Sequence, residues 1–83
     1  MTKYVYATKN LKSGNFNKPD LQDFPPENAR EVYEVSFKEA PVEQKGFIKE
    51  LEIYYLGEFD TKTGKFDQEK MTFIVGGSEI VGD

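Results

Sequence analysis

Residues 51–59 have the clearest alternation of apolar and polar positions in the chain, and this pattern predicts a β-strand. The strand is expected to carry two different faces, with Leu51, Ile53, Tyr55 and Phe59 on one and Glu52, Tyr54, Leu56 and Glu58 on the other. The loop at residues 60–64 has the length of a hairpin connection, and Gly64 is expected to take a positive φ before the chain returns through Lys65 and Phe66. We therefore expect this strand to lie at the centre of a sheet.

A helix is predicted at residues 26–40, because apolar residues recur there at spacings of three and four. Pro26 suits the first turn, acidic residues follow it near the positive end of the helix dipole, and Pro41 ends the segment. The stripe consists of Ala29, Val32, Tyr33, Ser36, Phe37 and Ala40. A strand is the alternative, since Tyr33, Val35 and Phe37 also alternate with polar residues. The helix is favoured because both ends carry stop signals.

The remaining segments complete a small α+β domain. β-branched and aromatic runs predict strands at residues 3–9 and 71–75, and the turn-rich residues 10–19 are expected to lead into a short stretch around Phe16. Residues 42–49 are expected to form a connection and residues 78–83 to lie at the edge or fray, and we find no internal repeat. The whole chain, residues 1–83, is expected to form one domain, an antiparallel sheet of three to four strands covered on one face by a single helix.

Composition narrows the class of protein. Seven Phe and five Tyr supply most of the large apolar side chains, and the absence of Cys excludes disulfides and thiolate metal sites. The N-terminus turns polar at Thr8 before it could form a signal peptide, and the apolar runs are too short to span a membrane. We expect a cytoplasmic protein without a membrane partner.

Enzymatic activity is not expected from this inventory. The chain has neither His nor Cys, which removes the commonest general base, metal ligand and thiol nucleophile. Glu52 and Glu58 lie about 20 Å apart on an extended strand at roughly 3.3 Å per residue, farther than the roughly 5–10 Å of a two-carboxylate hydrolytic site. Asp60 is better explained by turn chemistry than by a cation loop, and no phosphate-binding glycine motif follows Gly76. We therefore expect no catalytic residues, no metal and no cofactor.

Positive charge is concentrated at the start of the chain. Residues 1–19 hold four lysines and no acid, whereas residues 20–83 hold seven basic and fifteen acidic residues. A local group of lysines can neutralise a few phosphates even in a protein of net charge −4. The alternative is that these lysines only keep an exposed edge soluble.

Aromatic residues adjoin the lysines and suggest a surface for single-stranded nucleic acid, on which bases stack while amines contact phosphates. Most rings of so small a domain must be buried, and we expect this of Tyr33, Phe37, Tyr55, Phe59 and Phe73. The residues left as candidates for nucleic-acid binding are Lys3, Tyr4, Tyr6, Lys9, Lys12, Phe16, Lys18 and Tyr54.

Residues 56–66, Leu-Gly-Glu-Phe-Asp-Thr-Lys-Thr-Gly-Lys-Phe, resemble the pattern (I/L)-G-E-(F/Y)-D-x-x-T-G-x-F of the small non-structural protein of gokushoviruses, which are single-stranded-DNA microviruses. Residues 4–6, followed by Phe16 and Pro19, are similar to the opening of that family, and residues 27–30 to its helix start, although Ala7 or Thr8 stands where the family usually has Asp. The resemblance implies a phage protein absent from the virion and suspected of binding DNA during genome replication or packaging. The family provides no catalytic residues that could be carried over.

Two alternatives belong to other classes. An acidic helix face could bind a host protein by imitating the phosphates of a nucleic acid, and the residues that would form it are Asp20, Asp23, Glu27, Glu31, Glu34, Glu39 and Glu43. Such acids are also typical of any solvated helix. An exposed sheet edge could instead pair two copies into a homodimer.

Overall fold

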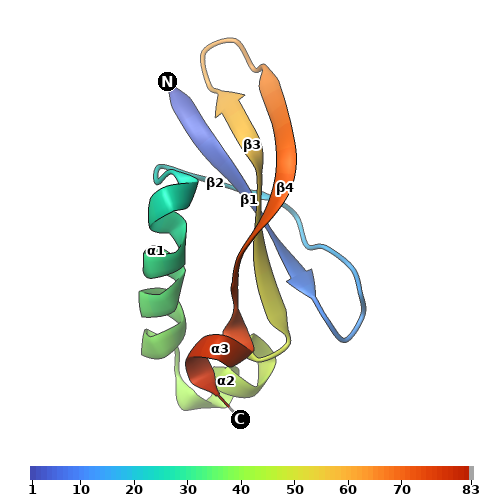
Figure 1. Ribbon diagram of the computed structural model, residues 1–83, viewed down its shortest axis with the longest axis vertical. Coiled ribbons are helices and arrows are strands. Elements are labelled where there is room, and N and C mark those ends of the chain that lie inside the picture. The colour runs from blue at the N-terminus through green and yellow to red at the C-terminus, as the bar shows by residue number, and fades with distance from the viewer. Residues whose placement is uncertain (83) are drawn as a thin grey trace.

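The protein is a four-stranded antiparallel sheet with one long and two short helices (Figure 1). The structure, a computed structural model, describes residues 1–82 of the chain. The elements in chain order are β1 (Thr2–Asn10), β2 (Asp20–Gln22), α1 (Pro26–Glu39), α2 (Val42–Ile48), β3 (Leu51–Asp60), β4 (Phe66–Gly76) and α3 (Gly77–Val81). The strands lie side by side in the order β2-β1-β3-β4, and each neighbouring pair is antiparallel.

The predicted α+β class and the central strand are confirmed, because β3 pairs with β1 on one side and β4 on the other. The predicted helix at residues 26–40 is also confirmed, whereas the expectation of a single helix is wrong. Residues 42–49 are not a mere connection: Pro41 ends α1 and at once becomes the N-cap of α2. The strand expected at residues 71–75 begins earlier, at Phe66, and runs without interruption from the hairpin.

The C-terminal residues fold back onto the helices instead of fraying. Gly77 starts α3, which packs against α1 and α2 (Figure 1). Arg30 of α1 holds this corner, because its guanidinium donates to the carbonyl of Ile74 at 3.3 Å and to the Glu79 carboxylate at 3.0 Å. The segment expected to lie at the edge or fray was residues 78–83, and its last residue, Asp83, lies outside the described residues.

Tyr6 lies at the centre of the core, between the sheet and α1. Its side chain is 1 % exposed and its ring contacts the rings of Phe24, Tyr33 and Tyr55 at centroid distances of 5.1, 5.8 and 5.4 Å. The buried hydroxyl donates a hydrogen bond of 2.8 Å to the carbonyl of Phe24, which satisfies its polar atom. Aromatic packing thus replaces the disulfides that the chain lacks.

A β-bulge divides β3 into two parts. Val5 lies opposite Gly57, whereas the next residue, Tyr6, lies opposite Tyr55, so Leu56 is an extra residue in β3. An extra residue shifts the period-two alternation by one, and every side chain beyond it changes face.

The bulge overturns part of the predicted face assignment. Phe59 lies opposite Lys3 and therefore on the other face from Tyr55, and it is half-buried instead of belonging to the core. Glu58 lies opposite Tyr4 and therefore on the face of Tyr55, so it does not share a face with Glu52. The alternation of the sequence is correct only up to the bulge.

Alkaline pH is expected to destabilise the protein through its buried tyrosines. Burial, reinforced by neighbouring tyrosines and acids, raises the pKa of Tyr6 and of Tyr55 well above the ordinary value of about 10, and burial raises the pKa of Tyr33 to about 12. The unfolded chain loses these protons first, so the stabilisation is fully present below about pH 10 and is lost as pH rises toward the folded-state pKa.

Tyr6 and Tyr55 are 1 % and 4 % exposed, and together they should lower the free energy of unfolding by up to about 3 kcal/mol per pH unit above about pH 10. Urea unfolding followed by circular dichroism at pH 9, 10 and 11 measures this slope. A midpoint that stays constant up to pH 11 would contradict the prediction.

Candidate nucleic-acid interface

The face of the sheet opposite α1 carries a row of aromatic rings, which we call the aromatic row: Phe16, Tyr54 and Phe73. Tyr54 lies in β3 between Ala7 of β1 and Phe73 of β4, and residues directly opposite each other in antiparallel strands share a face. Phe16 reaches the same face because it forms an isolated bridge with Lys9, two residues beyond Ala7. Three segments distant in sequence therefore supply one ring each.

The three rings form a continuous chain of edge-to-face contacts. The ring centroids of Phe16 and Tyr54 are 5.6 Å apart, and those of Tyr54 and Phe73 are 5.7 Å apart. Phe16 is 43 % exposed and Phe73 is 45 % exposed, while Tyr54 between them is half-buried. The contacts between neighbouring rings thus fix their positions, while the two outer rings stay accessible to solvent.

The four lysines predicted to bind nucleic acid do not all lie near the aromatic row. The ammonium of Lys9 lies 5.7 Å from the centroid of the Phe16 ring, so one amine belongs directly to the aromatic row. Lys12 and Lys18 are exposed in the adjoining loop, residues 11–19. Lys3 lies near the other end of β1, where its amine pairs with the carboxylate of Asp23. One of the four predicted lysines thus lies over a ring, two are exposed in the loop that carries Phe16, and the fourth is neutralised.

Two of the predicted stacking residues are on the wrong face. Tyr6 is buried beneath α1, so the expectation that folding leaves its ring uncovered is wrong. Tyr4, on the same face two residues before it, is partly buried and packs against the core. A stretch of alternating residues indicates which side chains share a face but not which face a helix will cover.

Phe73 is the residue that the sequence argument missed. It was expected in the core, yet it is exposed beside Tyr54. A bulge at the next residue causes this exposure. Ile53 pairs with Val75 and Tyr54 pairs with Phe73, so Ile74 is an extra residue in β4. No pattern in the sequence marks this second bulge.

One acidic group opposes phosphate binding at the aromatic row. Glu52 accepts a hydrogen bond of 2.7 Å from the Tyr54 hydroxyl, and this bond to the carboxylate raises the pKa of Tyr54. Glu52 also lies directly opposite Lys9 in the sheet. The lysine that lies over Phe16 is therefore the cross-strand neighbour of this acid.

The acids expected to form a phosphate-like face lie mainly on α1 and α2, away from the aromatic row. Two of them are paired: Asp23 with Lys3, and Glu34 with Arg30 at 3.7 Å. Glu27, Glu31, Glu39 and Glu43 are exposed. The exposed acids of α1 and α2 are thus separate from the aromatic row, although both helices also carry basic residues.

Among residues 1–82, no group of three or more acidic side chains is arranged to hold a metal ion, and these residues enclose no pocket. Their helices are all too short or too polar to cross a membrane. Comparison of the chain with protein-family models, with curated protein sequences and with solved structures gives no match.

Proposed function

We propose that the protein binds single-stranded DNA across the aromatic row. The observation that supports this most is the placement of three partly exposed, mutually contacting rings beside Lys9 on the sheet face that α1 leaves uncovered. Unpaired bases expose their π-faces to such rings, whereas the bases of a duplex are already stacked on each other. Lys12 and Lys18 in the adjoining loop supply phosphate contacts.

The biological setting follows from the resemblance of residues 56–66 to the gokushovirus non-structural protein. In that setting the protein acts in the cytoplasm of the host cell, on the single-stranded genome during replication or packaging. The acidic alternative, an inhibitor of a host protein, stays a prediction.

Salt dependence tests the proposal. Fluorescence anisotropy with a labelled 12-nucleotide oligothymidylate should detect binding at low salt, and the logarithm of the association constant should fall against the logarithm of the salt concentration with a slope of about −2, because three lysines contribute about 0.7 each. Exchange of two of them, Lys9→Glu with Lys12→Glu, should weaken binding at least about tenfold and flatten the slope.

The matched control is Lys38→Glu with Lys45→Glu, which changes the total charge equally but lies on α1 and α2. This control should bind nearly as tightly as the native protein. Absence of binding by the native protein at low salt, or an equal loss in both double variants, would contradict the proposal.

A further inference from the structure

The sheet has two hairpin loops of the same construction, one at residues 10–16 and one at residues 60–66. The first reads Asn-Leu-Lys-Ser-Gly-Asn-Phe and the second Asp-Thr-Lys-Thr-Gly-Lys-Phe. The expectation that the chain has no internal repeat is therefore wrong for these seven residues. The loops lie at opposite ends of the sheet, one after β1 and one between β3 and β4 (Figure 1).

Each loop is closed by the same backbone bonds. Asn10 donates to the carbonyl of Asn15 at 2.9 Å and accepts from Gly14 at 2.8 Å, while Asp60 donates to Lys65 at 2.9 Å and accepts from Gly64 at 2.7 Å. The two glycines have φ of 78° and 77°, a conformation that disfavours other residues.

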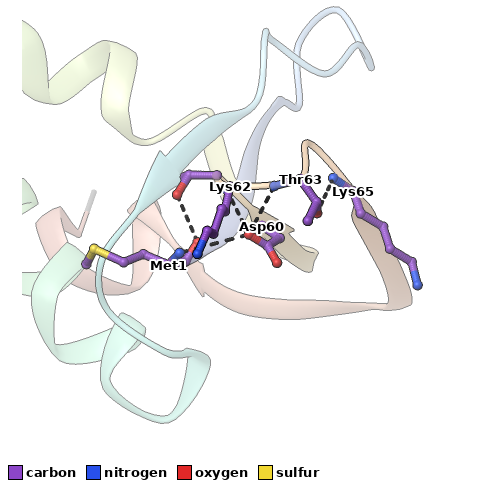
Figure 2. A network of polar contacts seen from close by, with 6 residues as sticks. Met1, Asp60, Lys62, Thr63 and Lys65 are labelled. Atoms are coloured by element: carbon purple, nitrogen blue, oxygen red, sulfur yellow. Dashed lines mark hydrogen bonds and ion pairs between the residues drawn. The ribbon is translucent and has the colours of Figure 1, made fainter.

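Side chains complete the two turns in the same manner, as Figure 2 shows for the second. The side-chain oxygen of Asn10 accepts from the backbone of Lys12 at 2.9 Å, and that of Asp60 accepts from the backbone of Lys62 at 2.8 Å. The Thr63 hydroxyl accepts from Lys65, as the Ser13 hydroxyl does from Asn15. The lysines are equivalent as well, since Lys12 and Lys62 occupy the same position in the two turns.

Each loop also rests on the residue that precedes the neighbouring long strand. The backbone N–H of Leu11 donates to the carbonyl of Glu50 at 2.7 Å, and that of Thr61 donates to the carbonyl of Met1 at 2.9 Å. β1 and β3 are antiparallel, so an approximate two-fold axis perpendicular to the sheet relates β1 and its loop to β3 and its loop. Rotation about such an axis leaves equivalent residues on the same face of the sheet.

The register places the two terminal phenylalanines on one face. Phe16 pairs with Lys9, and Phe66 pairs with Phe59, which itself pairs with Lys3. Lys3 and Lys9 are six residues apart in β1 and share a face. Phe66 is therefore on the face of the aromatic row, and at 44 % exposed it is as open as Phe16 at 43 %.

The acidic groups at the second loop have partners. The backbone hydrogen bond from Lys62 is the main cause that lowers the pKa of Asp60, so this carboxylate stays ionised, and the N-terminal ammonium of Met1 lies 3.9 Å from it. Asp67 pairs with Lys65 at 3.7 Å. The Lys62 amine has no acidic partner within residues 1–82, so this loop presents an unpaired cation, and the ring of Phe66 at its end is exposed.

We propose that the loop at residues 60–66 is a second contact for single-stranded DNA, equivalent to the loop at residues 10–16, so that one strand spans the whole face between them. The inference rests on the proposed function of the aromatic row. The seven residue steps of β3 between Glu52 and Phe59 separate the two ends by about 23 Å at roughly 3.3 Å per residue. Four nucleotides whose bases stay stacked at a spacing of about 3.4 Å cover about 14 Å and reach only one loop.

Oligodeoxyadenylates of 4 and 12 nucleotides, whose bases stack along the strand, are labelled with fluorescein and test this by anisotropy with the full chain. The native protein should bind the 12-mer more than about tenfold tighter than the 4-mer, because only the 12-mer reaches the second lysine and ring. Lys62→Glu with Phe66→Ser should remove at least about tenfold of the 12-mer affinity and change the 4-mer affinity less than about twofold. The turn is closed by backbone atoms and by the side chains of Asp60 and Thr63, which these substitutions keep. Unchanged far-ultraviolet circular dichroism checks that the variant keeps its fold.

The matched control is Lys38→Glu with Phe47→Ser, which removes an exposed lysine and an exposed ring from α1 and α2. This variant should keep both affinities. Native-like binding of the 12-mer by the loop variant would overturn the second contact and leave the proposed function standing, and so would an equal loss for both lengths, since that indicates a single site. Failure of the native protein to bind either oligonucleotide would instead overturn the proposed function.

Discussion

Replacement of Gly77 by alanine is expected to lower the free energy of unfolding by about 3 kcal/mol, because the new methyl group would enter space already filled by backbone. A Cβ at this position would meet the carbonyl oxygen of Ile48 first, and would also lie 2.7 Å from its carbonyl carbon and 2.8 Å from its Cγ2. The carbonyl cannot turn away cheaply, since it belongs to the last turn of α2. Either α3 or α2 must shift.

The loss is large for a chain of this size. A domain of 83 residues is stabilised by about 4–12 kcal/mol, at roughly 0.05–0.15 kcal/mol per residue. Gly46→Ala is the matched control, because Gly46 lies within α2 and a Cβ there meets nothing within 4 Å. That variant should be unchanged or more stable by up to about 1 kcal/mol.

Urea unfolding followed by circular dichroism compares the two variants with the native protein. If the midpoint of Gly77→Ala lies within experimental error of the native one, the close contact between α2 and α3 is not a constraint on stability. The prediction also concerns function indirectly, because α3 anchors the end of β4 that carries Phe73.

Removal of the two outer rings, Phe16→Ser with Phe73→Ser, is expected to weaken binding of single-stranded DNA at least about thirtyfold. Each stacked base contributes on the order of 1–3 kcal/mol, so even two contacts at the low end of this range account for the loss. Both rings are more than 40 % exposed, and their removal should disturb folding much less than removal of a core residue would.

Phe73→Tyr is the decisive companion variant, since it keeps a ring at the same position and should keep most of the affinity. Phe47→Ser on α2 removes an equally exposed ring from outside the aromatic row and should have no effect on binding. Anisotropy titrations at fixed low salt give the four affinities. Native affinity in the double serine variant would exclude stacking on these rings.

The lysines and the rings make separable contributions under this hypothesis. Loss of Lys9 and Lys12 should change the salt slope, whereas loss of the rings should lower affinity at every salt concentration. Proteins that bind single strands by charge alone would respond only to the first change. The pair of experiments therefore distinguishes a stacking surface from a merely basic one.

The sequence by itself determined the local structure of the chain. Alternation located β3, the stripe between Pro26 and Pro41 located α1, and turn chemistry located the loop closed by Asp60 and Gly64. These features are readable because they depend on neighbours one to five residues apart. The lysine-rich start of the chain was equally visible, and one of its amines, that of Lys9, lies over the exposed ring of Phe16.

Tertiary structure alone decided which face each ring occupies. Tyr6 is buried because α1 covers its side of β1, whereas on the other side Tyr54 is half-buried and Phe73 is exposed. The extra residues Leu56 and Ile74 reverse the alternation within β3 and β4, and a bulge is defined only by the partner strand that it faces. Contacts between strands far apart in sequence therefore assembled the candidate interface, which no local pattern could specify.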